Sequence, residues 1–205
     1  METVERPVLE WGFATLALPG QAESGDRHVV QPFPNGVMVA AVDGLGHGEE
    51  AAAAAKLAVS VLECHAREPV IALLRRCHEA LRETRGVAMS LASLRAPDGV
   101  LTWLGVGNVE SLLLRAAANP KVRHESLVLR GGVVGAHLPP LQAEVVPVMR
   151  GDMLILATDG IREGFADGLA LSDPPQELAD RILARHAKGT DDALVLVARI
   201  AGWGP

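Results

Sequence analysis

The chain has 205 residues, of which 49% are hydrophobic and 3% aromatic, and it carries a formal net charge of −6. This length suits one domain with a sizeable core, and the high apolar content argues against intrinsic disorder. The acidic balance and the scarcity of aromatic side chains argue against nucleic-acid binding, which relies on basic patches and stacking platforms.

In chain order, the hydrophobic pattern predicts a block of strands, two helices, a second block of strands, a third helix and a last strand. The first strands are expected at 11–18, 27–33 and 37–42, before helices that begin at Glu49 and Pro69. The second block is expected at 85–94, 99–107, 109–115, 125–130 and 153–157. Asp173 is placed to cap the third helix, which Gly189 ends, and the last strand covers 193–200.

The predicted strands at 37–42, 153–157 and 193–200 are apolar on both faces, or nearly so, which indicates strands that are covered on both sides. Strands and helices are grouped rather than alternating, which is typical of α+β proteins with mostly antiparallel sheets. We therefore expect a four-layer α-β-β-α sandwich. No linker or internal repeat interrupts the chain, so residues 1–205 are expected to form a single domain.

The sequence also bears on location. Cys64 and Cys77 lie in helix-like stretches and are expected to be buried free thiols, as in proteins of a reducing compartment. Residues 1–11 lack the apolar core of a signal peptide, and no apolar run is long enough to span a membrane. We expect a cytoplasmic protein that has no membrane partner.

Aspartates stand at the ends of several predicted strands. Asp26 lies at the start of one strand, Asp43 and Asp159 end buried strands and are followed by glycine, and Asp191 and Asp192 precede the last strand. In an antiparallel sheet the end of one strand and the start of its neighbour share an edge. These aspartates are therefore expected to meet at one rim of the sandwich.

The position of the turn predicts the register of the hairpin that would join Asp26 to Asp43. If Asn35 and Gly36 form a two-residue turn, His28 faces Asp43 and Asp26 lies just beyond it. This register brings Asp26 to the same edge as Asp43.

Carboxylates that are crowded together repel and raise one another's pKa, so a site that keeps several of them ionised favours a cation. Oxygen ligands suit hard divalent ions, which points to magnesium or manganese. Gly44 has no side chain, so its carbonyl group can reach a metal ion directly. The sequence therefore predicts a site for divalent cations at the rim.

Five segments are spread in order over nearly the whole chain: SGDRHVV, VDGLGHG, GVGNVE, ATDGIRE and TDDALVLVAR. Together they resemble the metal-dependent protein phosphatases of type 2C, and in particular the bacterial branch related to sporulation protein E. The resemblance implies a central β-sandwich flanked by helices and a centre of two divalent cations, Mn²⁺ or Mg²⁺. It implies that Asp43 bridges the two ions and that the Gly44 carbonyl binds one of them. Asp159 and Asp191 would bind the other, and Asp26 would lie on the first, directly or through water.

The resemblance also implies a reaction, in which a metal-activated water attacks a phosphoserine or phosphothreonine without a protein nucleophile. Asp26 and Asp43 would serve catalysis through the metal ions. His47 stands two residues beyond the place where eukaryotic members carry a candidate general acid. It could protonate the leaving oxygen or cap the following helix. The phosphate-gripping arginine of eukaryotic members has no clear match.

The implied partner is a phosphorylated bacterial signalling protein. A stressosome scaffold or sensor component fits a bare catalytic domain better than an anti-sigma-factor antagonist, which remains the alternative. A protein of another class, a catalytically silent pseudo-phosphatase that only binds a phosphoprotein, is disfavoured because all four metal aspartates are present.

Overall fold

A computed structural model of the chain describes residues 8–96, 98–116 and 124–202. In these ranges the strands are β1 (Leu9–Leu16), β2 (Asp26–Phe33), β3 (Gly36–Gly44), β4 (Val87–Arg95), β5 (Val100–Val106), β6 (Glu110–Leu114), β7 (His124–Ser126), β8 (Glu144–Pro147), β9 (Met153–Ala157) and β10 (Ala193–Ile200). The helices are α1 (Glu49–His65), α2 (Val70–Ala80) and α3 (Pro175–His186).

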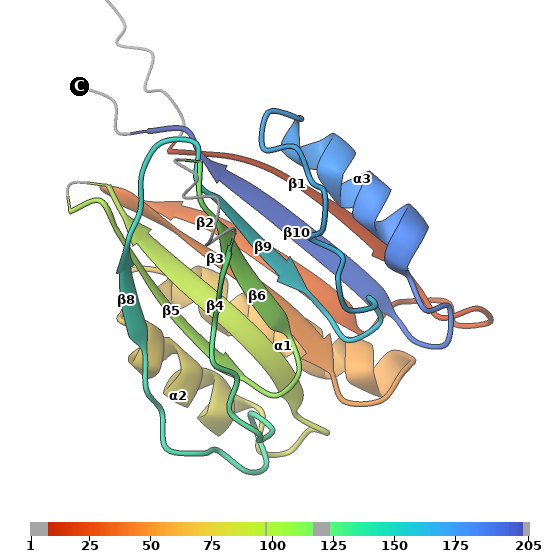
Figure 1. Ribbon diagram of the computed structural model, residues 1–205. Coiled ribbons are helices and arrows are strands. Elements are labelled where there is room, and N and C mark those ends of the chain that lie inside the picture. Colours follow the sequence, from red (N-terminus) through yellow and green to blue (C-terminus); the bar gives the residue numbers. More distant parts are fainter. Residues whose placement is uncertain (1–7, 97, 117–123, 203–205) are drawn as a thin grey trace, which may run out of the picture.

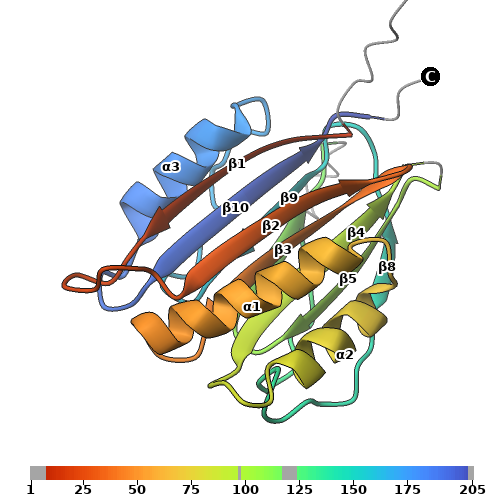
Figure 2. The same cartoon turned by 180° about the vertical axis from the view of Figure 1, so that it is seen from behind.

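The strands form two antiparallel sheets that stack face to face (Figure 1). The β3 sheet has the order β2-β3-β4-β5-β8, and the β10 sheet has the order β1-β10-β9-β6-β7. Helices α1 and α2 cover the outer face of the β3 sheet, and α3 covers the outer face of the β10 sheet, as the view from behind also shows (Figure 2). The predicted α+β sandwich of four layers is confirmed.

Three apolar clusters fill the spaces between these layers. Trp103 and Leu196 belong to the cluster between the two sheets, and Leu73 belongs to the cluster between the β3 sheet and its two helices. Phe165 and Ile182 belong to the cluster between the β10 sheet and α3. Strands β3, β9 and β10 contribute to a cluster on each of their faces, which explains why their sequences are almost entirely apolar.

The β2–β3 hairpin differs from its predicted register. Phe33 pairs with Gly36, so the turn residues are Pro34 and Asn35, and Asp26 pairs directly with Asp43. Asn35 has a left-handed φ of 63°, which an asparagine after a proline adopts in a tight turn. Gly36 instead lies in the strand, where a Cβ atom would come within 2.4 Å of a backbone oxygen of β4. The prediction was wrong by two residues, and the true register places the two aspartates directly opposite each other.

Other local predictions were also corrected. Asp173 does not cap α3, because its carboxylate accepts a 2.8 Å hydrogen bond from Arg181 and no side-chain hydrogen bond caps that helix. Strand β7 ends at Ser126, short of the predicted 125–130, and β8 was not predicted. The two thiols differ: Cys64 is exposed, whereas burial raises the pKa of Cys77 to about 12.

In the described ranges, no helix has both the length and the apolar character that a membrane crossing requires.

Candidate metal centre

The predicted aspartates gather at one end of the sandwich. Asp26 and Asp43 are paired neighbours at the start of β2 and the end of β3. Asp159 follows β9 and Asp191 precedes β10, and these two strands are antiparallel neighbours in the other sheet. Because β10 contacts β2 and β3 across the sandwich, the four positions lie along one rim.

The rim carboxylates are close enough to raise one another's pKa. Burial, followed by repulsion from Asp26, Asp159 and Asp191, raises the pKa of Asp43 to about 8. Burial also raises the pKa of Asp26 to about 7, although a hydrogen bond from Thr158 opposes the shift. Among the described residues, the charged groups that act on Asp43 are all carboxylates. The charge of Asp43 is therefore not balanced by a cationic side chain among the described residues.

Thr158 fixes the buried carboxylate of Asp26 across the two sheets. Its hydroxyl group donates a 2.7 Å hydrogen bond to Asp26 Oδ2 and accepts a 2.8 Å hydrogen bond from the backbone N–H of Leu194. Asp26 and Thr158 are each only 2% exposed, so water competes little for these bonds. The two hydrogen bonds join β2 to β10 through Thr158 and set the direction of Asp26.

Asp159 is held at the surface by two polar side chains. Asn108 donates a 2.6 Å hydrogen bond to Asp159 Oδ2, and the ammonium group of Lys188 donates to the Asp159 backbone carbonyl. Partial burial and the charge of Asp191 raise the pKa of Asp159, while Lys188 and Asn108 act in the opposite direction. One carboxylate oxygen of Asp159 is therefore occupied by Asn108, which leaves the other for an additional ligand.

The neighbours Asp191 and Asp192 have different environments. Asp192 is 3% exposed, and its two carboxylate oxygens each accept a 2.7 Å hydrogen bond, one from the backbone N–H of Leu18 and one from that of Gly25. Asp191 is half-buried, and its Oδ1 accepts a hydrogen bond from the Asp192 backbone N–H. Asp192 thus holds the segment before β2 in place, whereas Asp191 retains free acceptor capacity.

This difference gives a first prediction. The substitution Asp192→Asn should lower the free energy of unfolding by about 2–3 kcal/mol, because one of the two backbone N–H groups would then face an amide donor instead of an acceptor. The measurement is urea denaturation in the presence of a chelator. Asp191→Asn, which disturbs one local hydrogen bond, serves as the control and should cost clearly less. Equal losses in the two variants would contradict the assigned roles.

The glycine-rich loop after β3 is shaped by close packing. A Cβ atom on Gly44 would lie 2.2 Å from the backbone oxygen of Ala51 in α1, so the residue is required for packing irrespective of any metal. Gly48 has a φ of 79° and precedes α1, which no side-chain hydrogen bond caps. His47 is exposed in this loop. The capping role considered for His47 is therefore wrong, and its side chain remains available at the rim.

The donor set of the rim fits hard divalent cations. Carboxylate and carbonyl oxygens are the ligands that magnesium and manganese prefer, and the uncompensated charge of Asp26 and Asp43 would be relieved by a cation. Over the residues that the structure describes, no group of three His, Cys, Asp or Glu side chains is arranged to hold a metal ion. Magnesium usually keeps several water ligands and takes one or two carboxylates, so a magnesium ion does not require such a group.

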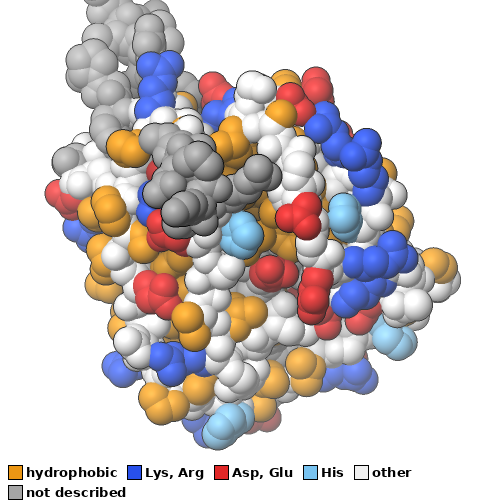
Figure 3. Space-filling model, in the orientation of Figure 1, with side chains coloured by type: hydrophobic (Ala, Val, Ile, Leu, Met, Phe, Trp, Pro, Cys, Tyr) orange, Lys and Arg blue, Asp and Glu red, His pale blue; other side chains and the backbone are white. Residues whose placement is uncertain are grey.

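The two arginines nearest in sequence to the rim aspartates differ in their contacts. Arg27 pairs with Glu23 and also donates to the backbone carbonyls of Ser24 and Asp26. Arg162 is exposed, and its backbone N–H bonds to His186. On the face of the molecule in Figure 3, acidic and basic side chains of the described residues are interspersed.

Sequence reasoning overlooked Thr158 and Lys188, and it placed Asp192 at the rim without giving it a role distinct from that of Asp191. The available signals were weak: a threonine that ends an apolar run, and a second aspartate beside the first.

Comparison with known proteins supports the resemblance. The sequence profile of the family described as Stage II sporulation protein E (SpoIIE) matches residues 34–201. The phosphoserine phosphatase RsbX of Bacillus subtilis (strain 168) is 28% identical over 183 residues, which cover 89% of this chain and 90% of that protein.

Solved structures share the fold over almost the full length. One of them is described as "The bacterial stressosome: a modular system that has been adapted to control secondary messenger signaling". Its chain has a TM-score of 0.84 and 29% identity, and the match covers 93% of this chain and 99% of that one. A crystal structure of RsbX in complex with magnesium has a TM-score of 0.83 and 20% identity, with 96% and 97% covered.

Proposed function

The chain belongs to the stage II sporulation protein E (SpoIIE) family, the bacterial branch of the type 2C phosphatases, and from this premise we propose that it is a metal-dependent protein phosphatase acting on phosphoserine or phosphothreonine. The observation that supports this proposal best is the gathering of Asp26, Asp43, Asp159 and Asp191 at one rim. Such a concentration of negative charge is costly in a folded protein unless cations neutralise it.

We propose that two divalent cations, Mn²⁺ or Mg²⁺, bind at this rim, through Asp26, Asp43 and the Gly44 carbonyl on one side and Asp159 and Asp191 on the other. Asp43 is proposed to face both ions, because it is repelled by the carboxylates of both sheets. When bound, such cations supply a water molecule of lowered pKa and neutralise phosphate charge.

The chain's own residues then position the reactants. Thr158 orients Asp26, and Asn108 orients Asp159, through the hydrogen bonds described above. His47 is exposed at the rim and is proposed to donate a proton to the serine or threonine oxygen as it leaves. The proposed reaction uses no cysteine or serine nucleophile of the protein.

The relatives suggest the setting of the reaction. The similarity to the phosphoserine phosphatase RsbX and to a chain of the bacterial stressosome supports a phosphorylated stressosome component as the substrate. An anti-sigma-factor antagonist is the alternative substrate within the same pathway. We further propose that residues 1–205 form one catalytic domain, which acts in the cytoplasm, where the exposed thiol of Cys64 would stay reduced.

The test of the proposed function is hydrolysis of a phenyl phosphate ester. We expect turnover with Mn²⁺ or Mg²⁺ and its loss after treatment with a chelator, followed by recovery when the cation is added back. Absence of turnover under all of these conditions would reject the phosphatase proposal and favour the pseudo-phosphatase alternative.

A further inference from the structure

A lysine side chain is fixed at the carboxylate rim by the segment that follows α3. Residues 186–188 lie antiparallel beside residues 160–162. The Lys188 N–H donates a 2.8 Å hydrogen bond to the carbonyl of Gly160, and the Lys188 ammonium group donates another to the carbonyl of Asp159. The backbone and the side chain of Lys188 are therefore both tied to the segment that carries Asp159.

The charge of Lys188 is not taken up by a carboxylate. Its side chain is exposed, and within the described ranges it forms no ion pair. The Asp159 carbonyl uses one of the three ammonium N–H groups, which leaves two donors for a further acceptor. Lys56, the other lysine of the described ranges, is instead paired with Glu23.

The ammonium group is also close enough to act on the rim. Burial and the charge of Asp191 raise the pKa of Asp159, and the charge of Lys188 opposes them. No cationic side chain of the described residues acts in this way on Asp26 or Asp43. The rim thus has one neighbouring side chain that could offer positive charge to an anion.

This placement suits a phosphate group better than it suits a metal ion. An ammonium group beside a carboxylate repels a cation that the same carboxylate would bind, so metal binding alone gives no reason for it. A phosphate group held over the rim would be attracted, because lysine offers a compact point charge and free N–H donors.

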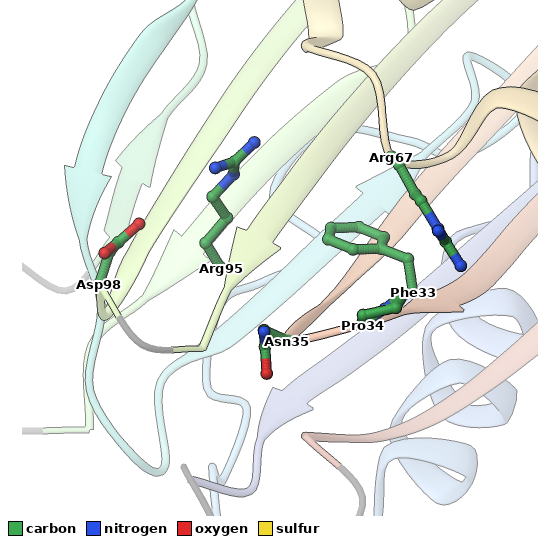
Figure 4. Close-up of a pocket in the computed structure, with 6 residues that line it drawn as sticks. All are labelled: Phe33, Pro34, Asn35, Arg67, Arg95 and Asp98. Carbon is green, nitrogen blue, oxygen red and sulfur yellow. The ribbon is translucent and has the colours of Figure 1, made fainter.

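Two arginines at the opposite end of the β3 sheet cannot reach the same phosphate group. Together with Phe33, Arg67 and Arg95 line a cavity of about 290 Å³ at the β2–β3 turn (Figure 4). The eight residues of β2 separate Phe33 from Asp26 by roughly 23 Å. That cavity is therefore remote from the rim.

We propose that Lys188 binds the phosphate group of the substrate, an inference that rests on the proposed function. Its ammonium group donates to phosphate oxygens from the side of the rim that carries Asp159. Because this contact exists both before and during hydrolysis, it lowers KM and leaves kcat nearly unchanged.

The test uses the full chain with Mg²⁺ and takes inorganic phosphate as the probe, with isothermal titration calorimetry as the readout. Lys188→Gln keeps an N–H donor for the Asp159 carbonyl but removes the charge, so it should weaken phosphate binding about tenfold. Lys188→Arg keeps the charge and should retain most of the affinity. The matched control is Lys56→Gln, which removes a lysine charge that Glu23 already pairs and should leave phosphate binding unchanged.

The kinetics of the phenyl phosphate ester separate a phosphate contact from a purely structural role. For Lys188→Gln we expect KM to rise about tenfold and kcat to stay within about twofold. The Mg²⁺ concentration for half-maximal turnover should not rise, because a charge that repels the metal ion is lost. A lysine that only holds Asp159 in place would give the other pattern, with a lower kcat, a higher Mg²⁺ requirement and unchanged phosphate binding.

Three results of the titration would overturn the inference. They are equal phosphate affinity in Lys188→Gln and the unsubstituted protein, a loss in Lys188→Arg as large as that in Lys188→Gln, and the same loss in Lys56→Gln. Phosphate binding that depends on Lys188 in a protein without ester turnover would reject the phosphatase function and keep the phosphate contact. Ester turnover with phosphate binding that ignores Lys188 would do the reverse, so the two failures are distinguishable.

Discussion

Replacing Asp43 with asparagine should abolish turnover of a phenyl phosphate ester, with a loss on the order of a thousandfold or more, because the residue on which both halves of the rim converge would lose its charge. Asp43 experiences repulsion from Asp26 in its own sheet and from Asp159 and Asp191 beside the other sheet, so its carboxylate lies close to both halves of the rim. The measurement is the steady-state rate with saturating Mn²⁺.

This loss should occur without loss of the fold. Asp43→Asn removes a charge that burial disfavours, so at a pH above about 8, in the absence of metal, the variant should be more stable than the unsubstituted protein. The exposed carboxylate of Asp98, at the far end of the β3 sheet, gives the matched control Asp98→Asn, whose turnover should be unchanged. Turnover by Asp43→Asn close to that of the control would refute the site assignment.

The second large effect is a loss of stability with rising pH that disappears when metal binds. The pKa values of Asp26 and Asp43 are raised from 3.8 to about 7 and about 8, so between these limits the folded protein binds more protons than the unfolded chain. Stability is then greatest below the unfolded pKa and falls as the pH rises through the folded pKa values. For the metal-free protein we expect a loss of several kcal/mol between about pH 4 and pH 8.

Divalent cations should remove this loss, because they bind the ionised carboxylates of the folded state and not those of the unfolded chain. The measurement is urea denaturation across this pH range, with a chelator and then with Mn²⁺. Asp43→Asn should flatten the metal-free profile, which separates the rim from other groups that titrate in the same range. A metal-free protein whose stability rises with pH over this range would contradict the charge balance inferred for the rim.

The order and type of most elements could be predicted from the sequence, since long apolar runs and helical periods are local signals. The convergence of the aspartates could also be predicted, because it follows from their positions at strand ends. The hairpin register could not be predicted, since Pro34-Asn35 and Asn35-Gly36 are both acceptable turns. The choice between them depends on contacts of Gly36 with Phe33 and β4.

The supporting residues of the site were hidden for the same physical reason. Thr158 donates a hydrogen bond to Asp26, which is 132 residues away in the sequence. Asp192 accepts a hydrogen bond from the N–H of Gly25, which is 167 residues away. A threonine or an aspartate at the end of a strand gives no indication of such distant partners. Their roles are properties of the packed sandwich rather than of any short segment.

The hydrogen bond from Leu18 to Asp192 joins positions 174 residues apart, and β1 pairs along its whole length with β10. Strand β1 therefore cannot pair until β10 has been synthesised, and the β10 sheet is incomplete without both strands. A nascent chain on the ribosome would remain without a complete rim until β10 emerges. Contacts between such distant parts of a chain also slow folding, so catalytic competence should be among the last properties that a newly made molecule acquires.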